Sequence, residues 1–398
     1  MNWEKAEYRL FALFACACTL AGGADWLSKR GDPQQTGWQK EEKLLNTRTV
    51  RQLRLLWKQK LNGRPNGLTD PLLLGPIITH RGIKELVFVK NSSDTVYAVD
   101  ADLGTIFWSR HLGESTSDVP CAESARMAPV MAPAPERPKN PKTEDNDNFS
   151  DANRPLYALS AEGRPYALRP STGGDFSPPL PFLPPSAKPA NLELFNNILY
   201  AATSPVCGGL PDRIWTLDLK GHSDPQWQPW KERSHALTTF QWKDRDLFAE
   251  LTSNGKLTLS NAEAASRPAR SGGLAAWQDA AGTRWINTTS ANGIRAFQVT
   301  GPKDQPTALL SWASRTLTAA GPPVVANGIL YFLSTAVGGT SNHLTLHALD
   351  ALNGKELYSS GSIIASRSSS GNIALANGHV CFSADDGVLY CFGLPFEM

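Results

Sequence analysis

One short pattern recurs in this chain, and it limits the folds that the chain can adopt. The segment VYAVDADLGTIFW, residues 96–108, has a close counterpart in LHALDALNGKELY, residues 346–358. Each predicts a strand that ends in Asp, a turn built on Gly, and a second strand that reaches a large aromatic residue. The chain therefore contains the same β-hairpin twice, at positions far apart in the sequence.

Further strands of this type follow one another along the chain. Aromatic-rich strands followed by turn residues begin at residues 96, 166, 214, 257, 294, 346 and 389. Their mean spacing is about 49 residues, which is typical of the blades of a β-propeller. The 32 Gly and 29 Pro residues favour many short strands and turns over long helices.

A single unit of this kind is a small antiparallel sheet that cannot bury both of its faces alone. A radial arrangement buries each face against a neighbouring unit and leaves only short edges exposed. The sequence therefore predicts an all-β fold, a single β-propeller of four-stranded blades, seven in number. An eighth blade is the alternative, if the long segment between Trp108 and Pro155 contains a weak one.

The two ends of the chain predict how the ring closes. The last hairpin, in NGHVCFSADDGVLYCFG, is followed by a short tail, so its blade has no outer strand of its own. The strand LRLLWKQKL, residues 53–61, belongs to no unit. Pairing the two would join the ends of the chain and remove an exposed edge. The alternative is an independent N-terminal arm.

Four positions of the repeat have a structural interpretation. They are Ala98, Asp100, Gly104 and Trp108 in one copy, and Ala348, Asp350, Gly354 and Tyr358 in the other. We expect the alanines to allow close packing near the axis, the aspartates to bond local backbone amides, and the glycines to adopt positive φ. The aromatic rings would cover the neighbouring blade. A repeated Asp is better explained as a turn residue than as a catalytic one.

The pattern A-x-D-x-x-x-G-x-x-x-W resembles the tryptophan-docking repeat of propellers of the pyrroloquinoline quinone (PQQ) type. The segment DWLSKRGDPQQTGWQKEEKLLNTRTVRQLRLLWKQKL is similar to the N-terminal segment of quinoproteins, and the C-terminal hairpin to the last blade of bacterial PQQ-like repeat proteins. A resemblance to quinoprotein dehydrogenases implies PQQ on the propeller axis, a calcium ion held by Glu, Asn and Asp, and an Asp that acts as the catalytic base. The sequence has no Cys-Cys pair and no motif that assigns these roles, so cofactor-binding and catalytic residues stay unassigned.

The N-terminus has the features of a secretory signal peptide. Two cations precede an apolar run at residues 10–20, and small residues follow it. The run is too short to span a bilayer. We therefore expect residues 1–24 to be a signal peptide, residues 25–398 to be the propeller domain, and the protein to be periplasmic or secreted. The alternatives are a buried helix and a lipoprotein signal that anchors the chain through Cys16.

Export would place the remaining cysteines in an oxidising compartment. Cys121, Cys207, Cys381 and Cys391 permit two disulfides with three connectivities. A three-residue turn with Gly387 in the left-handed conformation would put Cys381 directly opposite Cys391. The hairpin register therefore predicts a Cys381–Cys391 disulfide, and the alternative is two small apolar residues packed between blades. The roles of Cys121 and Cys207 stay open.

Other candidate sites have plainer explanations. Residues 133–154 are rich in Pro and charge and predict a solvated surface loop. The aspartates of this loop lack the Gly and the closing Glu of an EF-hand calcium site; they are Asp145, Asp147 and Asp151. No HExxH, GxSxG or P-loop motif occurs. The isolated histidines and tryptophans are more simply structural; they are His222, His235, His343, His347, Trp227, Trp230 and Trp277.

Two functional hypotheses follow from these observations. The net charge of +2 predicts no basic face for nucleic acid. The favoured hypothesis is an exported PQQ-like propeller that acts as a non-catalytic binding or scaffold module. We expect it to be a monomer without a transmembrane segment, with an unidentified protein or small-molecule partner and no metal site. The alternative is a PQQ-dependent oxidoreductase that binds PQQ with calcium and whose site residues have diverged.

Overall fold

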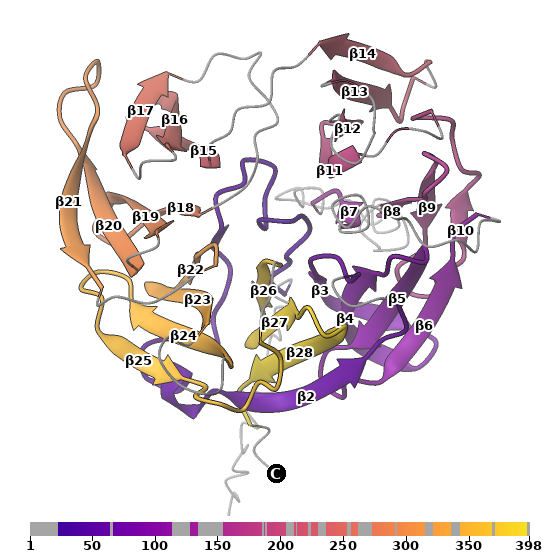
Figure 1. The fold of residues 1–398 in the computed structure, drawn as a ribbon, viewed down its shortest axis with the longest axis horizontal. Coiled ribbons are helices and arrows are strands. Elements are labelled where there is room, and N and C mark those ends of the chain that lie inside the picture. Colours follow the sequence, from indigo (N-terminus) through magenta and orange to yellow (C-terminus); the bar gives the residue numbers. More distant parts are fainter. Residues whose placement is uncertain are drawn as a thin grey trace, which may run out of the picture.

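The computed structural model shows seven small sheets arranged in a ring (Figure 1). It describes residues 23–63, 67–113, 128–133, 154–184, 187, 189–203, 211, 213–221, 224–229, 236–252, 256–261, 273–290, 293–314, 321–335, 343–367 and 371–395. These residues form strands and turns with one 3-10 helix, η1 (Thr49–Gln52). The fold is therefore a seven-bladed β-propeller, and the all-β prediction is confirmed. No helix of the described ranges has the length and apolar character needed to cross a membrane.

Blades are numbered here in chain order, and their strands are given from the axis outward. Blade 1 contains β3 (Leu72–Thr79), β4 (Gly82–Lys90), β5 (Thr95–Asp100) and β6 (Ile106–His111). Blade 2 contains β7 (Val130–Met131), β8 (Leu156–Leu159), β9 (Pro165–Leu168) and β10 (Asp175–Ser177). Blade 3 contains β11 (Pro189–Phe195), β12 (Ile198–Thr203), β13 (Arg213–Asp218) and β14 (Gln226–Pro229). Blade 4 has three strands in the described residues, β15 (Ala236–Trp242), β16 (Arg245–Leu251) and β17 (Leu257–Asn261).

The remaining blades complete the ring. Blade 5 contains β18 (Leu274–Gln278), β19 (Arg284–Ser290), β20 (Gly293–Thr300) and β21 (Thr307–Ala313). Blade 6 contains β1 (Trp38–Gln39), β22 (Val324–Ala326), β23 (Ile329–Thr335), β24 (Leu344–Asp350) and β25 (Glu356–Ser359). Blade 7 contains β26 (Ile373–Ala376), β27 (His379–Ser383), β28 (Val388–Gly393) and β2 (Arg54–Lys60). The segment between Trp108 and Pro155 supplies β7 to blade 2, so the ring has seven blades and not eight.

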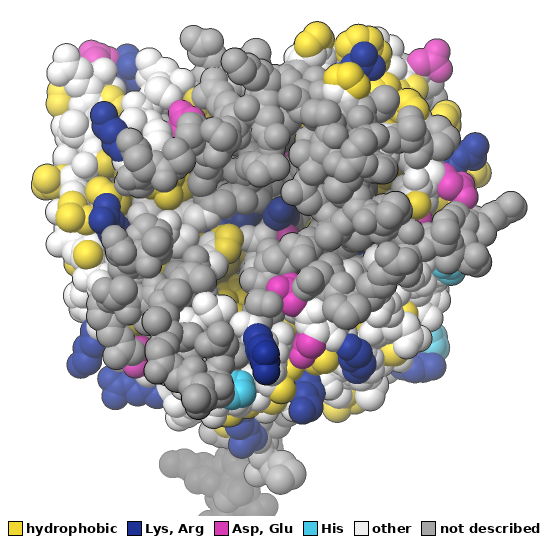
Figure 2. Space-filling view, viewed as in Figure 1, with side chains coloured by type: hydrophobic (Ala, Val, Ile, Leu, Met, Phe, Trp, Pro, Cys, Tyr) yellow, Lys and Arg dark blue, Asp and Glu magenta, His cyan; other side chains and the backbone are white. Residues whose placement is uncertain are grey.

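The N-terminal strand β2 closes the ring. It pairs antiparallel with β28, the last strand of the chain, with Trp57 opposite Cys391 and Lys60 opposite Val388. The predicted closure is confirmed, and the alternative of an independent arm is wrong. Figure 2 shows Lys and Arg side chains along the lower rim, over β2 and its neighbours. Exposed charge on an outermost strand protects its free edge from pairing with another chain.

Alternating side chains join a blade to its neighbours, as blade 1 shows. In β5, Val96 and Ala98 belong to the apolar cluster shared with blade 2, whereas Tyr97 and Val99 belong to the cluster shared with blades 6 and 7. This is the two-residue period of a strand, with both faces buried because both are covered by neighbouring sheets. Packing between blades therefore constitutes the core.

Three tryptophans lock adjacent blades together by the same contact. The indole N–H of Trp57 donates to Ala101 O (2.6 Å), that of Trp108 to Pro170 O (2.7 Å), and that of Trp312 to Ala351 O (3.1 Å). Each ring lies on a glycine of the next blade, and a Cβ atom there would come within 2.6 Å of it; the glycines are Gly104, Gly173 and Gly354. Their φ angles, 69°, 72° and 74°, also favour glycine. The repeat pattern in the sequence predicts Trp108 in such a contact, but it does not reveal the same role for Trp57 and Trp312 or the part played by Gly173.

The other repeat residues lie between blades or in turns. Asp100 Oδ1 accepts the amides of Asp102 (3.0 Å) and Leu103 (3.1 Å), and Asp350 Oδ1 accepts the amide of Leu352 (2.9 Å). Ala98 and Ala348 are fully buried, but in the third strand from the centre and not at the axis. The ring of Tyr358 packs against the cluster that joins blades 6 and 7.

The hairpin of β27 and β28 has the register that a three-residue turn requires. Gly387 adopts a φ of 76°, and the Ala384 amide donates to Val388 O (2.9 Å). Cys381 lies directly opposite Cys391, with Cα atoms 4.1 Å apart and the two sulfur atoms at bonding distance. Cys121 and Cys207 lie outside the described residues.

We expect Cys381 and Cys391 to form a disulfide when the protein is in an oxidising environment. A non-reduced proteolytic digest should then contain the two peptides as one linked species by mass spectrometry. The double variant Cys381→Ser/Cys391→Ser should lose about 2–3 kcal/mol of unfolding free energy, because the bond restricts the unfolded chain. A free thiol at either position, or a bond from either to Cys121 or Cys207, would contradict this pairing.

Candidate functional site

The centre of the propeller is occupied by the chain itself. Residues 24–39, called here the axial segment, run through the middle of the ring as the indigo trace in Figure 1. The segment begins beside blade 7, where the Ala24 amide donates to Asn377 Oδ1 (2.7 Å) and Asn377 Nδ2 donates to Ala24 O (2.9 Å). It ends as β1, which pairs parallel with β22.

The axial segment forms hydrogen bonds with the innermost strand of every blade. From blade 1 to blade 7 the partners are Leu73, Met131, Glu193, Thr239, Ala276, Val325 and Leu375. Most of these bonds join backbone groups, such as the Trp26 amide to Leu73 O (2.7 Å) and the Val325 amide to Gly37 O (2.8 Å). Backbone groups on the inner side of the ring would otherwise be without a strand neighbour. The axial segment is therefore a structural part of the ring.

A tight loop at residues 30–37 lets the segment reach blades 3 to 6. Asp32 Oδ1 accepts the Thr36 amide (2.9 Å), and its other carboxylate oxygen accepts the Thr36 hydroxyl. Burial raises the pKa of Asp32, and the bonds from Thr36 oppose that shift. Gly37 has a φ of 64°, and its amide donates to Arg30 O (3.1 Å). Gly31, Asp32, Thr36 and Gly37 thus shape this loop.

Arg30 is fully buried inside the loop. Its Nη2 donates to Pro323 O (2.8 Å), the residue just before β22 of blade 6, and to Leu274 O in blade 5. Burial lowers the pKa of Arg30 to about 10, and the charges of Asp32 and Asp70 oppose that shift. The guanidinium therefore stays charged at neutral pH and ties two inner strands to the axial segment.

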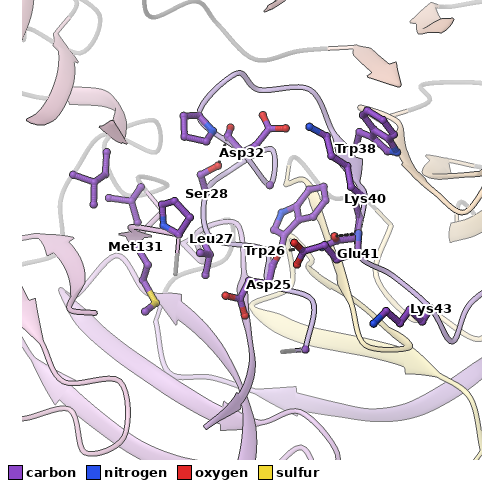
Figure 3. A pocket seen from close by; sticks show the side chains of 17 residues that line it. Asp25, Trp26, Leu27, Ser28, Asp32, Trp38, Lys40, Glu41, Lys43 and Met131 are labelled. Carbon is purple, nitrogen blue, oxygen red and sulfur yellow. Dashed lines mark hydrogen bonds between the residues drawn. The ribbon is translucent and has the colours of Figure 1, made fainter. Parts of the chain in front are cut away.

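A cavity of about 730 Å³ opens beside the axial segment (Figure 3). Trp26 and Trp38 contribute apolar surface, and Lys40 Nζ lies 4.9 Å from the Trp38 ring centroid. The charged side chains in the lining are Asp25, Asp32, Lys40, Glu41 and Lys43. Asp25 is already paired with Arg154 at 2.8 Å. The cavity thus combines two aromatic rings with charges of both signs.

The cavity opens on one identifiable face of the ring. We call it the turn face: it carries the turns between the first and second strands of each blade and those between the third and fourth. In blades 6, 7, 1 and 2 these turns include residues 327–328, 351–355, 377–378, 80–81, 101–105 and 169–174. The start of the axial segment lies there too, because Asn377, its partner, is in one of these turns. The turn face therefore holds both the cavity and the point where the chain enters the ring.

One ionisable cluster on the turn face was missed from the sequence. His379 lies 3.3 Å from Glu85 and 3.4 Å from Asp102, which belong to blade 1. Burial lowers the pKa of His379, but contacts with Asp102 and Glu85 outweigh burial and raise it to about 9. No local signal marks His379, because its partners are almost 300 residues away in the sequence.

PQQ does not fit the residues that the structure places at the centre. The axis that such a cofactor would occupy is filled by residues 24–39. PQQ is a tricarboxylate, and the cavity beside the axis presents Asp25, Asp32 and Glu41 to it as well as two lysines. Across the described residues, no group of three or more His, Cys, Asp or Glu side chains is placed to hold a metal ion.

The other sequence candidates take structural positions. His347 Nε2 lies 2.8 Å from Ser334 Oγ, and its ring stacks on Phe332. The Trp277 indole donates to Asn287 Oδ1 (2.7 Å). Trp227 stays half exposed under Arg213. Several candidates lie outside the described residues, namely Asp145, Asp147, Asp151, His222, Trp230 and His235.

We expect Gly37→Ala to destabilise the protein more than Gly328→Ala. Both glycines have positive φ, 64° and 71°, so both substitutions cost backbone strain of about 1–2 kcal/mol. A Cβ at Gly37 would also collide with the Arg30 guanidinium and lie 3.0 Å from Pro323 O, whereas nothing lies within 4 Å at Gly328. Chemical denaturation should show an excess loss of about 1–3 kcal/mol for Gly37→Ala. Equal losses would mean that the axial loop is not packed as described.

Comparison with known proteins identifies the fold alone. No protein-family model matches the sequence, and no curated protein matches it. A quinohemoprotein alcohol dehydrogenase from Comamonas testosteroni is 11% identical, with a TM-score of 0.46 over 94% of this chain and 81% of that one. BamB from Moraxella catarrhalis is 13% identical, with a TM-score of 0.38 over 87% of this chain and 99% of that one. The β-propeller domain of Cps50 (Swd1) from Myceliophteria thermophila is 11% identical, with a TM-score of 0.46 over 86% and 100%. These proteins are similar to the chain as β-propellers.

Proposed function

We propose that this protein is an exported β-propeller that acts as a non-catalytic binding module. The observation that carries the proposal is the axial segment, which bonds to the inner strand of every blade. Removing the segment to admit a cofactor would leave buried backbone groups without partners. The centre of the ring therefore has a structural role, and partners bind at the cavity and at the outer surfaces.

The cavity supplies one binding place of defined chemistry. Its volume of about 730 Å³ lies in the usual range for small-molecule sites. Trp26 and Trp38 favour a flat or apolar group, while Lys40 and Glu41 at the mouth favour a ligand with polar groups of both kinds. A strongly charged ligand of either sign would meet like charges there.

Export is supported by the sequence before the axial segment. The apolar run at residues 10–20 has the length and flanks of a signal peptide. The axial segment begins at Ala24, next to the expected cleavage position, and Ala24 is buried.

N-terminal sequencing of the protein from an expressing bacterium tests export directly. We expect the mature chain to begin near Ala24 or Asp25 and to be found outside the cytoplasm. An intact Met1 would contradict the proposal. A lipid-modified Cys16 would mean that the exported protein is anchored to a membrane and not free.

Adding PQQ and Ca²⁺ to the purified mature protein tests the non-catalytic role. We expect no quinone absorbance after desalting and no dye-linked oxidation of alcohols or sugars. Retained quinone together with oxidation would support the oxidoreductase alternative and contradict the proposal. Trp38→Ala is the matched control, because quinone bound in the cavity would be lost from that variant and quinone bound elsewhere would not.

A further inference from the structure

Exposed apolar side chains gather on the turn face of four consecutive blades. Most large apolar residues of the described chain are buried between blades, but these are open to solvent. They are Leu352 (46%) in blade 6, Leu44 (53%) over blade 7, Ile78 (85%), Ile83 (67%), Leu103 (62%) and Ile106 (42%) in blade 1, and Phe176 (37%) in blade 2. Single exposed apolar side chains are ordinary on any protein surface, but seven on one arc of the ring are not.

Their positions in the turns place them all on that face. Ile78 pairs with Ile83 across the hairpin of β3 and β4, next to its turn at 80–81. Leu103 and Leu352 occupy equivalent turns of blades 1 and 6. Leu44 lies against Gly378 in the turn that joins β26 and β27. The apolar groups therefore lie in the turns of this face or next to them.

Basic side chains accompany them on this face. Lys40, Lys43, Arg81 and Lys355 are exposed on or beside the same turns. None of the four forms an ion pair with a carboxylate in the described ranges, whereas the acidic Asp102 and Asp175 on this face are paired with His379 and Arg110. Glu41 and Glu356 are exposed carboxylates that oppose this positive charge, and Glu356 lies 3.3 Å from His347 Nδ1.

The chain also joins the ring on this face. Gly23 lies against Pro76 and Asn377, and Ala24 bonds to the Asn377 side chain.

We infer that the turn face of blades 6, 7, 1 and 2 binds an anionic lipid surface, with the apolar tips inserted among the lipid head groups and the lysines and arginine over their phosphates. Separate apolar tips with unpaired cations suit a bilayer, which accepts each tip independently. A specific protein interface would need a packed apolar centre with fully buried anchors. This inference goes beyond the proposed function and does not depend on whether PQQ binds.

Vesicle flotation of the mature protein tests the inference. We expect the protein to float with vesicles that contain phosphatidylglycerol, to float poorly with pure phosphatidylcholine, and to be partly released by high salt. The variant Ile78→Ser/Ile83→Ser should bind about tenfold more weakly at any salt concentration, since two apolar tips are lost. The variant Lys43→Gln/Arg81→Gln should bind roughly tenfold more weakly at low salt, and less so at high salt.

Two matched controls separate the turn face from general stickiness. Leu309→Ser/Leu310→Ser removes equally exposed apolar groups from β21 of blade 5. Lys58→Gln/Lys60→Gln removes two exposed cations near the far end of β2, which lies by the opposite face. Both controls should bind like the parent protein, and all variants should melt cooperatively. Failure of the parent protein to float with anionic vesicles overturns the inference, as does equal loss in the controls. Binding to an acidic protein without any vesicle binding overturns it too, while leaving the proposed function standing.

Discussion

The inner edges of the blades impose the constraint on which this ring depends. Each innermost strand turns one row of backbone amides and carbonyls toward the axis, where no further blade can pair with it. The axial segment meets that need with bonds to all seven blades, and the Arg30 guanidinium adds bonds to two carbonyls. The same stretch of chain then continues into β2 and completes blade 7. One N-terminal segment thus both fills the centre and closes the circumference.

Contacts between blades account for the rest of the stability. In the described residues, apolar clusters bury sheet faces at every junction except that between blades 3 and 4. Trp57, Trp108 and Trp312 each fix one junction by an indole hydrogen bond and a ring on glycine. Trp57 fixes the junction between the last blade and the first, so ring closure uses the same contact as two ordinary junctions.

The sequence predicted features that form local patterns, although it revealed the recurring tryptophan contact only at Trp108. The repeat spacing, the aspartate turns and the closing strand could be found because each is a local pattern or a missing strand in that pattern. Most of the axial contacts could not, since they join the backbone of residues 24–39 to backbone groups as remote as Val325, and backbone bonds leave no trace in side-chain identity. His379 was missed because Glu85 and Asp102 approach it from another blade. The alanines were misplaced toward the axis because the repeat indicates tight packing but not which strand provides it.

The turn face carries the cavity, the apolar tips and the start of the axial segment. Binding at the cavity requires the axial segment to be a fixed part of the fold, because the segment forms one of its walls. Hydrogen–deuterium exchange of the mature protein tests this most directly. The account predicts that amides in peptides covering residues 26–37 exchange as slowly as those of β18 and β22, which are bonded to them. Exchange of residues 26–37 as fast as the exposed turn at 80–81, with β18 and β22 still protected, would contradict it.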